Sequence, residues 1–278
     1  MVRRTPELLE IHRLLGERLG PRHWWPAKSP FEVAAGAILT QAVAWTNVEA
    51  AIARLEAAGL MSAQAISAAD PEGLAELVRP AGYYRAKARK LQALASHIVE
   101  GYGGRIEAMA ARPLDELRPE LLDIYGVGPE TADAIILYAL GLPSFVVDAY
   151  TFRVFGRLGH WPEVFARPRY EEVRAFFQSR LPADAALYNE FHAQIDRVGH
   201  ALCLKSRPVC GECPLAEVCR REGSSAPRTD VRPASKPRPG NKRPARKAGR
   251  GGPGGGFRPP TWEEKLGGGG KSIKKFSF

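Results

Sequence analysis

The sequence predicts an all-α protein of roughly ten helices. Apolar residues recur three and four positions apart in its longer segments, and helix-start signatures recur along the chain. No segment shows the alternating pattern of a convincing strand. The run FVV at 145–147 is the best strand candidate, and it is too short to seed a sheet.

The helices are expected in the following order. Residues 1–20 form an amphipathic pattern, and Ser29-Pro30-Phe31-Glu32 fits a capping box with proline at the first helical position. Thr46 repeats that signature before a helix that Gly59 ends. Asp70-Pro71 opens a short helix, and the segments 88–102 and 170–181 have helical periodicity.

The positive charge is concentrated at one end. The chain of 278 residues has a formal net charge of +10, yet residues 221–278 hold 15 Lys/Arg and 4 Asp/Glu, which leaves the first 220 residues near neutrality. This tail is rich in Gly and Pro and cannot bury enough surface to fold. We expect a disordered segment that attracts nucleic acid non-specifically, or one that only improves solubility.

The targeting signals of membrane and secreted proteins are missing from the sequence. No apolar run is long enough to span a bilayer, and residues 1–20 lack the apolar core of a signal peptide. We therefore expect a monomeric cytoplasmic protein that associates with the nucleoid, not a secreted one.

All four cysteines lie within 17 residues, which is the pattern of a metal site rather than of a disulfide framework. Four thiolates suit either a tetrahedral zinc ion or a 4Fe–4S cluster. Zinc sites usually show two close pairs of ligands, and only one such pair is present, which favours iron–sulfur while the spacing leaves the metal open. The ligands are Cys203, Cys210, Cys213 and Cys219.

Lys205 and Arg207 lie between the first two cysteines, on a loop that the metal would hold at both ends. A rigid loop with two cations is a plausible phosphate contact, and the alternative is a solvated loop.

A glycine-rich turn, Gly126-Val127-Gly128-Pro129, separates two apolar helical segments. Two glycines permit a tight turn with exposed amides, and a helix start adds partial positive charge. Such a turn is a phosphate site or a plain helix–helix connection. Asp148 follows the apolar run FVV at a helix start, where it is an N-cap, a site carboxylate, or both.

The segment GVGPETADAIILYALGLPSFVVDAYTFRVFGRLG, together with the cysteine spacing, resembles the endonuclease III superfamily of helix–hairpin–helix DNA glycosylases. The resemblance covers about residues 5–220. It implies a core of residues 1–220, in which a helical lobe (about 26–135) faces a lobe made of 1–25 and 136–220 that ends in a 4Fe–4S loop. Damaged double-stranded DNA would bind between the lobes, and Asp148 would be the catalytic carboxylate.

The sequence departs from bifunctional members of that family at one position. They carry a lysine two residues after the second glycine, where this chain has Glu130. A carboxylate cannot form a Schiff base, and residues 91–204 contain no lysine. We therefore predict a monofunctional glycosylase with little or no lyase activity.

Three segments resemble the 3-methyladenine glycosylase III branch, which removes alkylated purines and typically lacks the cysteine loop. They are Trp24-Trp25-Pro26, the segment 78–91 and the motif around Glu130. Trp24 and Trp25 would stack on a cationic base, or would form a hydrophobic lid over the helical lobe. Glu130 would line the same pocket. The alternatives are an enzyme for oxidised pyrimidines or mismatched thymine, and a DNA-binding protein without catalysis.

The resemblance also assigns residues that would contact DNA. Gln41 would fill the gap left by the extruded nucleotide, and Tyr83 and Tyr84 would wedge into the opposite strand. Without the resemblance, these residues are an exposed helical glutamine and packing aromatics. The sequence identifies His192 and His200 only as structural residues.

Overall fold

The computed structural model describes residues 5–22, 24–25 and 27–222, and the regular structure in these ranges is entirely helical. The all-α prediction is confirmed. Residues 145–147 form an extended connection without a strand partner. No helix among the described residues combines the length and apolar character needed to cross a membrane. Of the predicted tail, residues 221–278, all but the first two residues lie outside the described residues.

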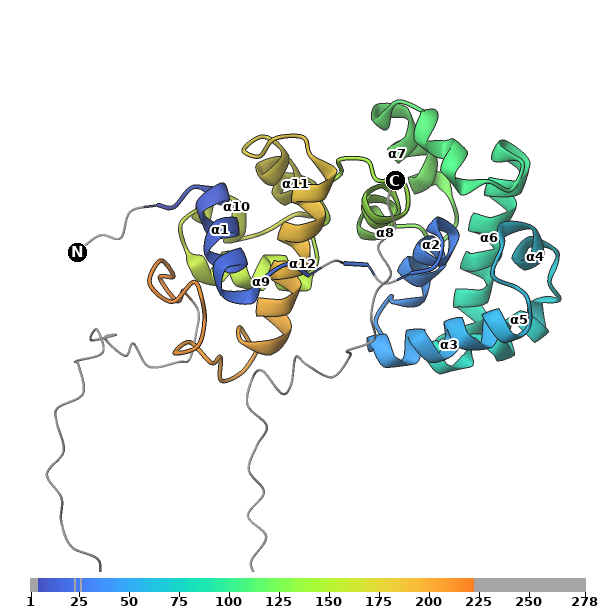
Figure 1. Cartoon of the computed structure of the whole chain (residues 1–278), viewed down its shortest axis with the longest axis horizontal. Coiled ribbons are helices and arrows are strands. Elements are labelled where there is room, and N and C mark those ends of the chain that lie inside the picture. The colour runs from blue at the N-terminus through green and yellow to red at the C-terminus, as the bar shows by residue number, and fades with distance from the viewer. Residues whose placement is uncertain (1–4, 23, 26, 223–278) are drawn as a thin grey trace, which may run out of the picture. The chain divides into compact units, whose positions relative to one another are not determined.

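One group of helices follows the chain from residue 30 to residue 139 (Figure 1). Helix α6 packs against α2, α4 and α5 and is the centre of this group. The group comprises α2 (Pro30–Leu39), α3 (Trp45–Ala57), α4 (Ala63–Ala68), α5 (Pro71–Leu77), the 3-10 turn η1 (Arg79–Ala81), α6 (Tyr84–Tyr102), the 3-10 turn η2 (Ile106–Ala111), α7 (Leu114–Asp123), α8 (Pro129–Ala134) and the π-helical turn η3 (Ile135–Ala139).

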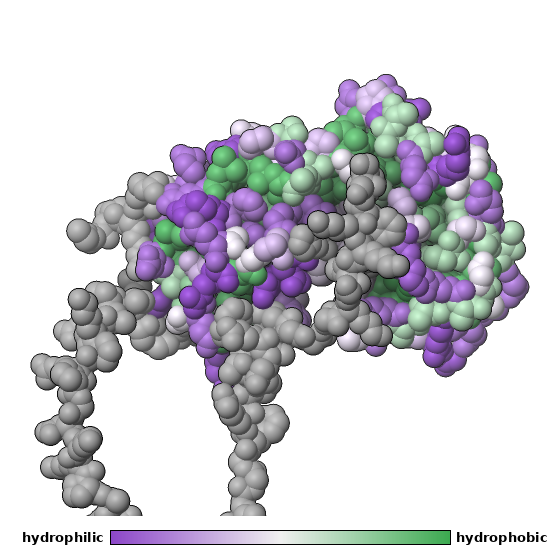
Figure 2. Space-filling view, viewed as in Figure 1, coloured by the Kyte–Doolittle hydropathy of each residue, from purple (hydrophilic) through white to green (hydrophobic). Residues whose placement is uncertain are grey.

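A second group joins the start of the described chain to its end. It contains α1 (Leu8–Leu19), α9 (Ala149–Leu158), α10 (Pro162–Phe165), α11 (Tyr170–Gln178) and α12 (Ala185–Ala201). Helix α12 packs against both α1 and α9. Buried phenylalanine rings fill the space between these helices, and Phe145 stacks on Phe177 with ring centroids 4.0 Å apart. Hydrophilic side chains cover much of the visible surface, with apolar patches between them (Figure 2).

The helix starts follow the expected chemistry with two corrections. Ser29 accepts a hydrogen bond from the Glu32 amide, as a capping box requires, but the Glu32 carboxylate accepts from the Lys28 amide instead of the Ser29 amide. Helix α3 begins at Trp45, before Thr46, and Ala44 precedes it without a side-chain cap. The prediction of a Thr46 cap was wrong because capping depends on the backbone angles of the preceding loop, which the motif does not fix.

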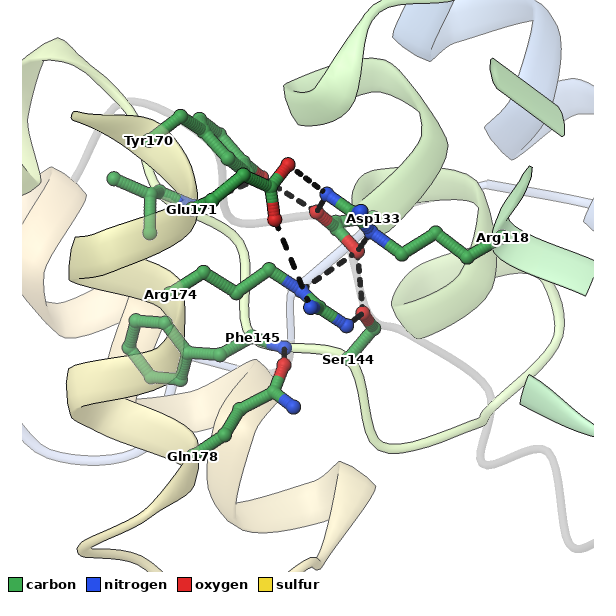
Figure 3. Close-up of polar contacts among 9 residues, drawn as sticks. Arg118, Asp133, Ser144, Phe145, Tyr170, Glu171, Arg174 and Gln178 are labelled. Carbon is green, nitrogen blue, oxygen red and sulfur yellow. Dashed lines mark hydrogen bonds and ion pairs between the residues drawn. The ribbon is translucent and has the colours of Figure 1, made fainter. Parts of the chain in front are cut away.

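A buried carboxylate connects the two groups of helices (Figure 3). The Asp133 side chain is fully buried on α8. Arg118 of α7 donates to its two oxygens at 2.9 and 3.0 Å, and Arg174 of α11 pairs with it at 3.1 Å. The hydroxyls of Ser144 and Tyr170 also donate to this carboxylate. One carboxylate therefore fixes α8 against α11 and against the connection between η3 and α9.

The same network reaches the residue before Asp148. The Tyr170 hydroxyl donates to Asp133 at 2.9 Å and accepts from the Val147 amide at 3.4 Å. Burial, followed by the charge of Asp133, raises the pKa of Tyr170 far above its usual range, so its hydroxyl stays protonated. The extended segment that presents Asp148 is thus held by a neutral hydroxyl, which accepts from the Val147 amide.

Replacing Asp133 by asparagine should lower the free energy of unfolding by about 3–5 kcal/mol, because Arg118 and Arg174 would lose their buried counter-charge and keep only the exposed Glu171 as an acidic partner. Denaturant unfolding measures the change. Asp115→Asn, at an exposed position on α7, is the control and should cost less than about 1 kcal/mol. Equal stability of the two variants would contradict the role assigned to Asp133.

Candidate active site

Asp148 is the N-cap of α9, and its two carboxylate oxygens have different surroundings. Oδ1 accepts hydrogen bonds from the Thr151 amide at 2.6 Å and from the Thr151 hydroxyl at 2.7 Å. Oδ2 lies 3.9 Å from Nε2 of His192, and 13% of the side chain is exposed. The N-cap alternative from the sequence is therefore correct, and it leaves one oxygen directed away from the cap.

Two further carboxyl groups lie near Asp148. Desolvation of its carboxyl group, followed by the charge of Asp148, raises the pKa of Glu130 to about 7, although the residue as a whole is exposed. The same two causes raise the pKa of Asp196 on α12 to about 6. Three carboxyl groups close together cannot all ionise cheaply, so the neighbours of Asp148 hold protons at higher pH than usual. Asp196 was not anticipated from the sequence.

Four aromatic rings form a cluster next to these carboxyl groups. The ring centroid of Trp25 lies 5.8 Å from that of Trp24, 5.2 Å from that of Trp45 and 5.3 Å from that of Tyr138. All four residues are partly buried. The predicted pair therefore lies in an aromatic site, and the sequence reasoning missed Trp45 and Tyr138. Trp45 begins a helix and Tyr138 lies in a π-helical turn, so helical periodicity gave no signal for either residue.

His192 connects this aromatic cluster to Asp148. Its Nδ1 lies 2.5 Å from the Tyr138 hydroxyl, and its Nε2 faces Asp148. The sequence offered only a structural role, since a histidine on an apolar helix face is usually a core residue. The structure places it beside the candidate catalytic carboxylate.

The glycine turn contacts Gln41 and Lys90. The Gln41 amide donates to the Gly126 carbonyl at 3.1 Å and to the Thr131 hydroxyl at 3.0 Å, and Lys90 donates to the Gln41 Oε1 at 2.5 Å. Gly126 has a φ of +83°, and a Cβ there would lie 2.1 Å from the Lys90 side chain, so glycine is required. Gln41 is therefore held against the turn in this structure.

The members of the turn differ in their contacts. The Val127 amide donates to the Ile124 carbonyl at 3.0 Å, and the Val127 side chain is buried. Val127 thus stabilises the turn from within. Gly128 is the N-cap of α8, and no heavy atom lies within 4 Å of the position that a Cβ would take, so the backbone is open to approach at this point.

Tyr83 and Tyr84 have different environments. Tyr83 is 80% exposed and has a φ of +45°, which is unfavourable for a residue with a Cβ. Tyr84 is half-buried, with Arg79 and Arg85 placed 5.4 and 5.3 Å from its ring centroid. Of the two predicted wedge residues, Tyr83 is the one available to a partner.

A buried lysine connects the end of α2, just before Gln41, to the end of η1, just before Tyr83. The Lys87 ammonium donates to the Leu39 carbonyl at 2.8 Å and to the Ala81 carbonyl at 2.7 Å. Burial, followed by the charge of Lys90, lowers its pKa to about 8. The last residues of α2 and η1 are therefore tied to one side chain.

The four cysteines are free thiols that line one cavity with mostly apolar walls. Arg157 of α9 donates to Sγ of Cys203 at 3.3 Å, and Sγ of Cys219 approaches the Arg157 carbonyl at 3.3 Å. No three His, Cys, Asp or Glu side chains within the described ranges are arranged to hold a single metal ion. Lys205 and Arg207 are exposed on the connecting loop, which both a phosphate contact and a solvated loop would require.

Comparisons of the sequence with known proteins identify its family and its relatives. Residues 35–183 match the family model of the HhH-GPD superfamily of base excision DNA repair proteins. A protein of Methanocaldococcus jannaschii, provisionally named a DNA repair glycosylase, is 44% identical over 76% of this chain and 95% of its own length. Endonuclease III of Thermotoga maritima is 31% identical over 77% of this chain and 94% of its own length.

Solved structures show the same fold. A non-covalent endonuclease III–DNA complex has a TM-score of 0.63 and 26% identity, covering 78% of this chain and 97% of the other. The 3-methyladenine DNA glycosylase of H. pylori bound to 1,N6-ethenoadenine has a TM-score of 0.56 and 27% identity, covering 69% and 96% of the two chains.

The raised pKa of Glu130 should make part of the stability depend on pH. The protonated carboxyl group of Glu130 favours the folded state. Its contribution to the free energy of unfolding is therefore complete below about pH 4.5 and is lost as the pH rises through about 7. Melting temperatures measured from pH 4 to 8 should therefore fall less for Glu130→Gln than for the unmodified protein. The exposed Glu163→Gln serves as the control, and an unchanged pH profile for Glu130→Gln would contradict the assignment.

Proposed function

Because the chain belongs to the HhH-GPD superfamily of base excision DNA repair proteins, we propose that it is a monofunctional DNA glycosylase that hydrolyses the N-glycosidic bond of alkylated purines in duplex DNA. The observation that carries the proposal is the aromatic cluster around Trp25 beside three carboxyl groups, with Glu130 at the position where bifunctional relatives have a lysine.

The aromatic cluster suits a base that carries positive charge. Faces of electron-rich rings attract cations by roughly 0.5–2 kcal/mol. The carboxylate of Asp148 adds a negative charge close to the cluster. A purine methylated at a ring nitrogen is cationic, and it stacks as a planar ring. The likeness to the H. pylori 3-methyladenine glycosylase also supports this class of substrate.

Asp148 is placed to act on the sugar of an extruded nucleotide. The bond between C1′ and the base nitrogen breaks, and its electron pair leaves with the cationic base, which becomes neutral. A water oxygen bonds to C1′, and the proton that this water loses passes to the Asp148 carboxylate and then to solvent. The free Oδ2 is the oxygen for this role because Thr151 occupies Oδ1. A fixed carboxylate also stabilises the positive charge that develops on the sugar.

Residues 91–204 contain no lysine, and the two lysines of α6 discussed above have other partners. Lys90 donates to Gln41, and the Lys87 ammonium is buried between two carbonyls. A lyase step needs a nucleophilic amine at the sugar. The product should therefore be an intact strand with an abasic site.

DNA contacts follow from the exposed elements. The backbone at Gly126 and Gly128, together with Lys205 and Arg207, would contact phosphates, and Tyr83 would enter the duplex. Gln41 would leave its contacts with the turn to pair with the orphaned base. The strained backbone of Tyr83 is a cost that such a contact explains.

We assign the four cysteines to a 4Fe–4S cluster, for which their shared, mostly apolar-walled cavity provides a suitable enclosure. Cys203, Cys210, Cys213 and Cys219 would be its ligands. The cluster would supply a rigid support for the loop that carries Lys205 and Arg207, since glycosidic hydrolysis transfers no electrons. Arg157 would hold the first ligand through its contact with Cys203.

The likeness to endonuclease III of T. maritima favours a second candidate, an enzyme for oxidised pyrimidines. A panel of duplexes with 3-methyladenine, thymine glycol or a T:G mismatch distinguishes the candidates. We expect release of the alkylated purine, and release of pyrimidine lesions alone would refute our assignment.

Asp148→Asn should lower the single-turnover rate of base release by on the order of a hundredfold or more, because it removes a fixed charge at the sugar. Asparagine also caps helices well, so the melting temperature should change little. An unchanged rate of base release would exclude Asp148 as the catalytic carboxylate and would favour a protein that binds DNA without acting on it.

Glu130→Lys tests the basis for the lack of lyase activity. The unmodified protein should cut the strand only after alkali and should form no borohydride-trapped adduct with DNA. The variant places an amine close to Asp148, and a trapped adduct should appear. Strand nicking without alkali by the unmodified protein would show that another residue supplies the lyase step.

A further inference from the structure

His192 differs from the other residues of the candidate site because one of its ring nitrogens has a partner and the other does not. The residue is 7% exposed, and its Nδ1 lies 2.5 Å from the Tyr138 hydroxyl. Nε2 is buried without a hydrogen-bond partner in the described chain and lies 3.9 Å from Oδ2 of Asp148. A buried polar atom without a partner requires a functional or structural explanation.

The surroundings indicate which nitrogen carries the proton. Burial, followed by the charges of Asp148, Asp196 and Glu130, raises the pKa of Tyr138 well above its usual range, so its hydroxyl stays protonated. A protonated hydroxyl close to Nδ1 can donate to it. This donation selects the tautomer whose proton lies on Nε2, which faces Asp148.

We propose that Tyr138 and His192 form a hydrogen-bonded relay that positions Asp148 for hydrolysis. Tyr138 donates to Nδ1, and the Nε2 proton of His192 is directed at Oδ2. The distance of 3.9 Å is longer than a hydrogen bond, and such contacts often shorten only when the substrate is bound. His192 is a positioning residue in this scheme, because it acts through Asp148.

The relay explains how Asp148 keeps its reactive oxygen directed toward the sugar. Thr151 holds Oδ1 at the start of α9, and His192 on α12 would hold Oδ2 from another element of the fold. A carboxylate fixed through both oxygens cannot rotate away when the cationic base departs. Preorganisation of this kind is the main source of electrostatic catalysis.

Tyr138 also connects the relay to base recognition. Its ring centroid lies 5.3 Å from that of Trp25, and the ring therefore forms part of the aromatic cluster. A base that stacks in this cluster would contact the residue that sets the proton position on His192. Correct occupation of the pocket and correct orientation of Asp148 thus depend on the same side chain. This inference rests on the proposed glycosylase function.

The experiment compares rate, binding and stability in three variants. His192→Leu removes both ring nitrogens, His192→Gln keeps a donor near the position of Nε2, and Tyr138→Phe removes only the hydroxyl. The matched control is His200→Gln, because His200 also lies on α12 with its Nδ1 3.3 Å from a tyrosine hydroxyl, that of Tyr150, but is exposed. The substrate is whichever lesion duplex the unmodified protein cleaves in the panel.

We expect His192→Leu to lower the single-turnover rate by on the order of a hundredfold and Tyr138→Phe by about tenfold. Affinity for the same duplex with a non-hydrolysable 2′-fluoro sugar should stay within about twofold, since the relay acts on the reacting oxygen. His192→Gln should recover most of the rate, and His200→Gln should behave like the unmodified protein. Unchanged rates for His192→Leu and Tyr138→Phe would overturn the proposal, as would equal losses of rate, affinity and melting temperature that glutamine does not rescue.

A second measurement does not depend on activity or on the folding of the leucine variant. ¹⁵N NMR of the imidazole in the full chain should show a proton on Nε2 and none on Nδ1 of His192, and Tyr138→Phe should change this distribution. The opposite tautomer in the unmodified protein would exclude the relay. If no lesion in the panel were released, the proposed function would fail, and the tautomer would still decide whether the relay exists.

Discussion

The arrangement of the site depends on the burial of one carboxylate. Asp133 interacts with Arg118 of α7, with Arg174 of α11 and with Ser144 in the connection before α9. It therefore holds together three segments that are not part of one helix. Such a charge is stable only while all of its partners remain in place. The fold therefore holds Asp148 through a network that is either complete or strongly destabilised.

Two carboxyl groups near Asp148 have raised pKa values. The carboxyl groups of Glu130 and Asp196 are desolvated and lie near the charge of Asp148, which favours their neutral forms. Asp148 itself accepts two hydrogen bonds from Thr151 through Oδ1. In the proposed glycosylase, the aromatic rings would therefore attract a cationic base without three full negative charges beside them.

Local sequence patterns were sufficient for the helical fold, for the cap at Asp148 and for the grouping of the cysteines. These features depend on short-range spacing, which the sequence contains directly. The pairing of Tyr138 with His192 depends on the packing of η3 against α12, and no local pattern predicts it. The contact of Lys90 with the turn has the same origin, because Lys90 reaches Gln41 from α6, which lies outside the segments that flank the turn. Trp45 was hidden by an incorrect helix start, which made it look like a loop residue.

Lys87 has a consequence for how this protein could diversify. Its ammonium joins the ends of α2 and η1 through the Leu39 and Ala81 carbonyls, and neither contact involves the aromatic rings around Trp25. Evolution could therefore exchange those rings while the connection between α2 and η1 stayed constant.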